Sequence, residues 1–233
     1  MRKAHIFLLV VFILTLGMAG CGSKAKPAAT PAGQTGTTAP TPKPPAPDRT
    51  GWPVIVTFGD SLTAGQGVAP ERNYPSQLQA ALDKQGYKYR VVNAGISGDT
   101  SAGALNRVEA VVNQKPVIVI LEMGANDGLQ GKSVAQMRAN LATIIERLQK
   151  AGVKLVLAGM EIPPNYGPEY TQAFRESFTG LASQYHVPLI PFFLDGVGGR
   201  PDLNLPDGVH PTGDGYVYVV KNVMAVLQPL LTK

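Results

Sequence analysis

The chain has 233 residues, of which 44% are hydrophobic and 16% are charged, and its formal net charge is +5. Five of the 21 basic residues but none of the 16 acidic residues precede residue 48, so the rest of the chain is neutral overall and a nucleic-acid-binding function is not favoured. The only cysteine, Cys21, excludes an internal disulfide, and the sequence offers no set of zinc ligands, so we expect neither a metal nor another cofactor.

Residues 1–20 have the features of an export signal. Two basic residues near the start precede a largely apolar run over residues 6–16, and small residues follow. A helix over that run rises only about 16 Å, which is too short to cross a bilayer. Cys21 follows Met18-Ala19-Gly20, and this segment resembles the bacterial lipobox, so we expect a lipoprotein signal peptide with the lipid attached at Cys21. An ordinary secretory signal with an incidental cysteine is the alternative.

Residues 21–47 are predicted to form a disordered tether behind the lipid-anchored cysteine. Ala, Pro, Thr, Gly and Lys dominate this segment, which contains nothing able to form a core. Proline-rich chains favour extended conformations, so the tether would hold the remaining residues, 48–233, well away from the anchor as one globular domain. The expected location is the cell envelope or periplasm of a bacterium, as an exported, membrane-anchored lipoprotein.

Beyond the tether, short apolar runs alternate with longer segments of helical periodicity. The predicted strands are Val54–Phe58, Tyr89–Asn93, Val117–Leu121, Lys154–Met160 and Val187–Pro191. The predicted helices are Tyr74–Gln85, Ala102–Gln114, Val134–Ala151, Glu169–Tyr185 and Tyr216–Leu230. The third strand is apolar on both faces, which is typical of a parallel strand covered by helices on each side. The pattern predicts an α/β fold, a three-layer α/β/α sandwich with a five-stranded parallel sheet.

Polar residues follow each of the first three predicted strands. Ser61 lies three residues past the first strand, Gly95 to Gly98 follow the second, and Asn126 lies five residues past the third. Because loops at the carboxyl ends of parallel strands meet at one edge of the sheet, we expect these residues to converge there. The polar loop 207–210 precedes the last helix and is placed to fold over the same edge.

His210 is the candidate general base. Of the three histidines, one lies in the predicted signal, and His186 sits at a helix end before a strand, where packing or the helix dipole explains it. Asp207, three residues before His210, can accept a hydrogen bond from the imidazole Nδ1–H and so select the tautomer with a free Nε2. The alternative interpretations are a helix-capping role for His210 and an Asx turn at Asp207.

Ser61 is the candidate nucleophile for ester hydrolysis through an acyl-enzyme, although a serine after a strand also commonly caps a helix. Asn126 offers an amide donor for the oxyanion of the tetrahedral intermediate, or is a turn residue that tolerates left-handed geometry. Gly95 and Gly98 either permit a tight turn or expose a backbone N–H to the reacting carbonyl.

Four segments together resemble the signature blocks of the SGNH/GDSL hydrolase family, and the likeness covers essentially all of residues 52–233. The segments are Gly59-Asp60-Ser61-Leu62, Asn93–Gly98, Gly124–Asp127 and Asp207–Pro211. Within the family, the chain is similar to the acyl-CoA thioesterase I, lysophospholipase L1 and arylesterase group. The resemblance implies a flavodoxin-like fold with Ser61 as nucleophile, His210 as base and then acid, and Asp207 as the residue that orients it. It also implies an oxyanion hole formed by the Ser61 N–H, the Gly98 N–H and the Asn126 side chain, and a segment over residues 162–170 that borders the acyl-binding groove.

The expected function is hydrolysis of carboxylic esters or thioesters, such as acyl esters, lysophospholipids and acyl-CoA-like substrates, through a Ser61 acyl-enzyme. A carbohydrate O-acetyl esterase of the cell envelope is the alternative enzyme, because it would use the same catalytic groups. A non-catalytic binding lipoprotein and a lipid carrier are alternatives of a different class. We expect a monomer whose partners are its small-molecule or lipid substrate and, through the anchor, a membrane.

Overall fold

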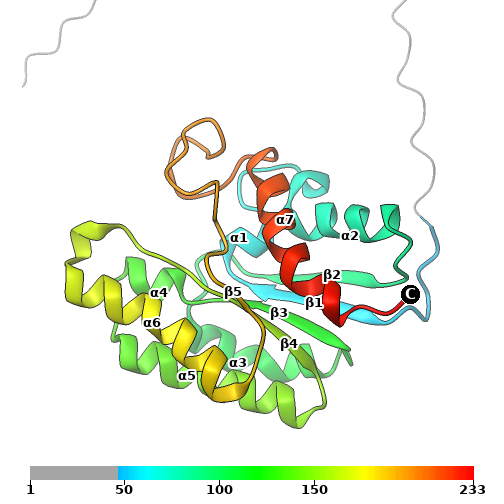
Figure 1. The fold of residues 1–233 in the computed structure, drawn as a ribbon, viewed down its shortest axis with the longest axis horizontal. Helices are drawn as coiled ribbons and strands as arrows, with labels where there is room; N and C mark the ends of the chain where they lie inside the picture. The colour runs from blue at the N-terminus through cyan, green and yellow to red at the C-terminus, as the bar shows by residue number, and fades with distance from the viewer. Residues whose placement is uncertain (1–46) are drawn as a thin grey trace, which may run out of the picture. The chain divides into compact units, whose positions relative to one another are not determined.

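A parallel sheet of five strands forms the centre of the part of the chain that the computed structural model describes, residues 47–233 (Figure 1). The strands are β1 (Val54–Gly59), β2 (Arg90–Gly95), β3 (Ile118–Glu122), β4 (Lys154–Ala158) and β5 (Leu189–Ile190). Their order in the sheet is β2-β1-β3-β4-β5, and every neighbouring pair is parallel. This is the flavodoxin-like, doubly wound order, which confirms the predicted fold class.

Helices cover both faces of the sheet and form the outer two layers. Helices α2 (Tyr74–Lys84) and α7 (Gly215–Leu227) pack side by side on one face, while α3 (Ser101–Val112), α5 (Val134–Lys150) and α6 (Pro168–Tyr185) cover the other (Figure 1). The central strands β1 and β3 are buried along their whole length, as their continuous apolar sequence predicts. The edge strand β2 is only partly covered.

Two short helices that are not among the predicted elements begin just beyond the central strands. Helix α1 (Ser61–Ala64) follows β1, and α4 (Ala125–Leu129) follows β3. Three 3-10 turns complete the regular structure: η1 (Pro70–Arg72), η2 (Pro164–Tyr166) and η3 (Gln228–Leu230). The predicted last helix therefore ends at Leu227, and its final three residues form η3, which contains Pro229.

The last strand is shorter than the predicted range Val187–Pro191. Pro188 and Pro191 flank β5 and have no N–H to donate to a neighbouring strand. The Pro188 carbonyl still accepts from the Leu157 N–H at 2.9 Å, so Pro188 keeps one hydrogen bond to β4.

The predicted signal peptide, residues 1–20, and the tether up to residue 46 lie outside the described residues. Within residues 47–233, no helix combines the length and the apolar character that crossing a bilayer requires.

Candidate active site

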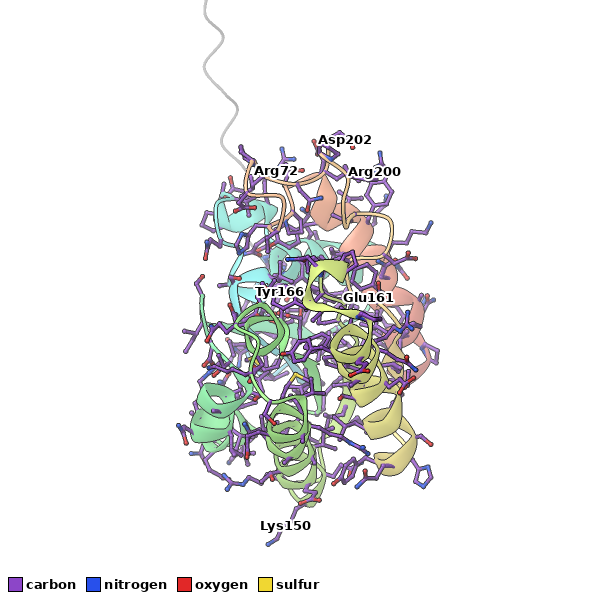
Figure 2. All side chains as sticks on the ribbon, turned by 90° about the vertical axis from the view of Figure 1, so that its left-hand side faces the viewer. Arg72, Lys150, Glu161, Tyr166, Arg200 and Asp202 are labelled. Carbon is purple, nitrogen blue, oxygen red and sulfur yellow. The ribbon has the colours of Figure 1, made fainter. Side chains whose placement is uncertain are left out.

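The segments predicted to converge do so at the carboxyl edge of the sheet. Ser61 is the first residue of α1, Asn126 lies in the first turn of α4, and His210 sits in the loop before α7. Because β1 and β3 are adjacent in the sheet while their connections run in opposite directions, this edge contains the point where the strand order reverses, the usual ligand site of such folds. Figure 2 looks onto this edge, with the labelled Glu161 and Tyr166 near its middle.

Ser61, His210 and Asp207 form a hydrogen-bonded chain. The Ser61 Oγ lies 2.9 Å from His210 Nε2, and His210 Nδ1 lies 2.8 Å from Asp207 Oδ2. Backbone N–H groups of Val209 and His210 also donate to Asp207 Oδ1, at 2.9 and 3.0 Å. These bonds and the imidazole lower the pKa of Asp207 from 3.8 to about 2, so this carboxylate is ionised and accepts only. The Nδ1–H must then be the donor, which leaves Nε2 free to accept the Ser61 proton.

The second histidine of the described residues lies away from this chain. His186 is the C-cap of α6 and adopts the left-handed conformation, with φ of 53°. The sequence interpretation of His186 as a helix-end residue is therefore confirmed.

Asp60, and not Ser61, caps α1. The Asp60 Oδ1 accepts from the Leu62 N–H at 3.0 Å, which leaves the Ser61 hydroxyl available for His210. The preceding Gly59 cannot be replaced without displacement of its neighbours, because a Cβ there would lie 2.0 Å from Thr63 Oγ1 and 2.4 Å from Glu122 Oε2. The turn that presents Ser61 is thus closely packed from below.

Ser61 and Gly98, which line the same pocket, each have a free backbone N–H group. Within residues 47–233, neither the Ser61 N–H nor the Gly98 N–H donates a hydrogen bond to another residue. Gly98 adopts φ of +80°, a conformation that glycine reaches without strain. The Gly95 N–H, in contrast, donates to Asn93 Oδ1 at 2.9 Å. Of the two glycines weighed from the sequence, Gly98 is therefore the one with a free donor.

The Asn126 amide lies beside these donors but is engaged on both sides. Its Nδ2 donates to Asp60 Oδ2 at 3.1 Å and to the Asp99 carbonyl at 2.9 Å. A bound oxyanion would compete with one of these acceptors for an amide hydrogen. Asp127, next in the chain, faces inwards and accepts from the Ser101 N–H at 2.8 Å, so it holds the start of α3.

The structure also places at the site two acidic residues that the sequence analysis did not single out. Asp60 is 1% exposed, and burial raises its pKa from 3.8 to about 6. Glu122, at the end of β3, is fully buried, and burial together with the charge of Asp60 raises its pKa well above the usual value. The only sequence signal for Glu122 was a charged residue directly after a continuous apolar strand.

A groove of about 590 Å³ runs away from the Ser61 hydroxyl. Its wall is largely apolar and comprises Leu62, Leu129, Met160, Ile162, Pro163, Phe192, Leu194 and Val209. Ile162 and Pro163 belong to the segment 162–170 expected to border such a groove. That segment is fixed to the neighbouring chain because the Tyr166 hydroxyl donates to the Leu129 carbonyl at 2.7 Å.

One charged side chain of the groove wall lies outside the hydrogen-bonded set around Ser61. Glu161 is exposed, and among residues 47–233 no hydrogen bond or ion pair engages its carboxylate. The lining residues include no lysine or arginine. Glu161 is therefore an acidic group of the groove wall that is free to contact whatever binds there.

Comparison with known proteins agrees with this geometry. The model of the GDSL-like Lipase/Acylhydrolase family matches residues 57–218. "Esterase TesA" of Pseudomonas aeruginosa is 43% identical over 178 residues, covering 76% of this chain and 89% of the relative. "Thioesterase 1/protease 1/lysophospholipase L1" of Escherichia coli strain K12 is 36% identical over 178 residues, covering 76% and 84%. The crystal structure of the esterase EstA from Pseudoalteromonas inhibited by monoethylphosphonate superposes with a TM-score of 0.73 at 34% identity, covering 76% of this chain and 97% of that chain.

Proposed function

We propose, because the chain belongs to the GDSL-like lipase/acylhydrolase family and is an esterase or thioesterase of it, that Ser61 is its nucleophile. We propose further that its substrates are esters or thioesters of medium or long acyl chains. The observation that carries the assignment is the continuous chain of hydrogen bonds from Ser61 through His210 to Asp207.

In the proposed first step, the Ser61 oxygen attacks the ester or thioester carbonyl while His210 Nε2 takes the serine proton. The ionised Asp207 holds the imidazole in the required tautomer and stabilises the imidazolium that forms. The imidazolium then protonates the departing alcohol or thiol. In the second step His210 removes a proton from the water that attacks the acyl carbon. The imidazolium returns this proton to the Ser61 oxygen as the bond between that oxygen and the acyl carbon breaks and the acid leaves.

The proposed oxyanion hole consists of the Ser61 N–H, the Gly98 N–H and the Asn126 amide. The two backbone donors are free in this structure, which supports their assignment. Asn126 would contribute by redirecting an amide hydrogen from Asp60 or from the Asp99 carbonyl. Loss of one oxyanion donor typically lowers the rate by about 10²–10³.

The groove favours acyl substrates larger than acetyl. Its volume of about 590 Å³ falls within the range that holds drug-sized ligands, and its wall is mainly aliphatic and aromatic. Each methylene buried against such a wall contributes about 0.8 kcal/mol, which corresponds to about a fourfold rise in kcat/KM. An acetyl group would leave most of this surface unused.

A chain-length series tests both parts of the proposal. We expect kcat/KM to rise from p-nitrophenyl acetate through butyrate to octanoate, and Ser61→Ala to abolish turnover of every ester and labelling by a fluorophosphonate. S61A activity well above background would overturn the nucleophile assignment. Equal or falling kcat/KM with chain length would overturn the acyl-chain assignment and favour the O-acetyl esterase.

We also propose, from the sequence alone, that the protein is exported and anchored in a bacterial cell envelope by lipid on Cys21. The supporting features are the signal over residues 1–20, the lipobox-like segment before Cys21 and the tether to residue 47. Expression with radiolabelled palmitate should label the full chain and place it in the membrane fraction. Cys21→Ser should lose both properties. Retention of label in C21S would refute the anchor.

A further inference from the structure

Glu122 is a buried carboxyl group directly beneath the turn that presents Ser61. It is fully buried, and its Oε2 accepts from the Thr63 hydroxyl at 2.8 Å and from the Asp60 N–H at 3.3 Å. Strand pairing fixes this position, because the register of β1 with β3 sets Gly59 opposite Glu122. No lysine or arginine within residues 47–233 pairs with Glu122. The Glu122 carboxyl group therefore accepts hydrogen bonds here, but no lysine or arginine pairs with it to balance a negative charge.

Asp60 connects Glu122 to the reacting groups on the other side of the turn. Its N–H donates to Glu122, its Oδ1 accepts from the Leu62 N–H, and its Oδ2 accepts from Asn126 Nδ2. Both the Ser61 backbone and the Asn126 amide are therefore positioned through a residue that Glu122 holds. Glu122 itself lines no part of the groove, so it can act only through these neighbours.

The surroundings of Glu122 favour its neutral form. Burial and the adjacent Asp60 both raise the pKa of Glu122, and two carboxyl groups in contact in a buried site do not both ionise readily. The other titratable groups facing it are the hydroxyls of Tyr74 from α2 and Tyr216 from α7, whose pKa values are raised by burial and by Glu122 itself. None of these neighbours supplies a positive charge.

We propose that Glu122 is a positioning residue that, as a neutral carboxylic acid, fixes the Asp60–Ser61 turn and, through Asp60, the Asn126 amide. The inference rests on the proposed catalytic roles of Ser61 and Asn126. A neutral acid performs this task without placing a second negative charge beneath a site where an oxyanion develops. Its contribution lies in the geometry of the transition state and not in contact with substrate.

Two replacements at residue 122 separate positioning from filling of the core. Glu122→Gln keeps a neutral group with an acceptor oxygen, so we expect it to retain most of the kcat. Glu122→Met keeps a similar bulk but leaves the Asp60 N–H and the Thr63 hydroxyl without an acceptor. We expect E122M to lower kcat about 10- to 100-fold with little change in KM, because small displacements of reacting groups have effects of that size. Each rate is divided by the number of active sites, which is counted by fluorophosphonate labelling at saturation, so that the kcat values refer to folded enzyme.

The pH profile tests the protonation state. E122Q replaces a neutral acid with a neutral amide, so the acid limb of the kcat profile should stay where it is in the parent enzyme. An ionised Glu122 would instead place a negative charge close to the reacting groups and favour their protonated forms, and E122Q would then move the acid limb to lower pH. Equal kcat for E122M and E122Q, or a displaced acid limb in E122Q, would overturn the proposal.

A threonine pair supplies a second test that leaves Glu122 in place. Thr63→Val removes the hydroxyl that makes the shorter of the two hydrogen bonds to Glu122. Thr57→Val removes an equally buried hydroxyl that donates to the Val92 carbonyl at 3.1 Å. We expect kcat to fall in T63V and not in T57V. Equal effects would mean that loss of any buried hydroxyl here has the same consequence, which contradicts the proposal. The S61A variant is measured in the same assay to separate the two possible failures. Residual turnover in S61A would refute the proposed function. An inactive S61A, together with an unchanged kcat in E122M and T63V, would refute only the role of Glu122.

Discussion

Replacement of Asp60 by asparagine should change how the stability of the protein depends on pH. Asp60 is 1% exposed, and burial raises its pKa from 3.8 to about 6. The folded protein therefore binds a proton at Asp60 more tightly than the unfolded chain does. The stabilisation from that proton is fully present below about pH 4 and is lost as the pH rises through about 6. D60N has no proton to lose at this position, so its stability should not show this decline.

The magnitude follows from the two pKa values. At about 1.4 kcal/mol for each tenfold change in proton affinity, the gap between 3.8 and about 6 corresponds to about 3 kcal/mol. A small part of the loss has already occurred at pH 4, so the stability of D60N relative to the parent should rise by about 2–3 kcal/mol between pH 4 and pH 8. The asparagine also disturbs the hydrogen bond with Asn126, but that cost is the same at each pH and cancels from the difference.

Urea unfolding of the purified protein at pH 4, 5, 6, 7 and 8 measures this difference directly. Asp214→Asn is the matched control, because the Asp214 side chain is 78% exposed and should give a nearly constant difference. Since Glu122 lies against Asp60, repeating the pair in an E122Q background removes the second buried carboxyl group. A D60N difference that stays constant or falls as the pH rises would refute the reasoning.

Three further predictions concern the orienting carboxylate, the groove wall and the nucleophile turn. Asp207→Asn should lower kcat by about 10²–10⁴ with little effect on KM, since its amide can hold the wrong imidazole tautomer, whereas Asp202→Asn, an exposed partner of Arg200, should not. Steady-state kinetics on one ester that showed similar kcat values for both variants would contradict this. Glu161→Lys should raise kcat/KM for an acyl-CoA about two- to fivefold relative to kcat/KM for a neutral ester of the same acid. This increase should be smaller at 1 M salt, and a ratio that does not change with salt would contradict an electrostatic effect of residue 161. Gly59→Ala should lower the free energy of unfolding by at least about 2 kcal/mol in urea titrations, because its Cβ would lie 2.0 Å from a neighbouring hydroxyl oxygen; an unchanged midpoint would show that the turn relaxes freely.

Residue chemistry and strand pattern were sufficient to predict which polar side chains meet at the carboxyl edge of the sheet. Short apolar runs between helical segments predict a parallel sheet, and such a sheet collects the residues that follow its strands at one edge. Ser61 and Asn126 follow adjacent strands, and His210 was the only histidine in a polar loop. The order of strands and helices along the chain was therefore almost sufficient to predict that these residues lie close together.

The support beneath these groups depended on contacts that no local pattern contains. Glu122 touches the nucleophile turn only because the register of β1 with β3 pairs it with Gly59, and a shift of that register would move it away. The engagement of Asn126 by both Asp60 and the Asp99 carbonyl likewise depends on three chain segments that are distant in sequence and packed together. The start of α1 likewise depends on its Asp60 cap, and the two ends of β5 depend on the prolines that flank it.

By itself, the sequence determined the fold class, because the alternation of strands and helices depends on composition and periodicity along the chain. It also supports the proposals made for export, for the anchor at Cys21 and for the roles of Ser61, Asp207 and His210, which rest on composition and spacing. Tertiary structure alone decided which acids are buried and which N–H groups remain free. Burial and hydrogen-bond satisfaction arise when segments distant in the chain pack together, and proton affinities respond to that packing and not to neighbours in sequence.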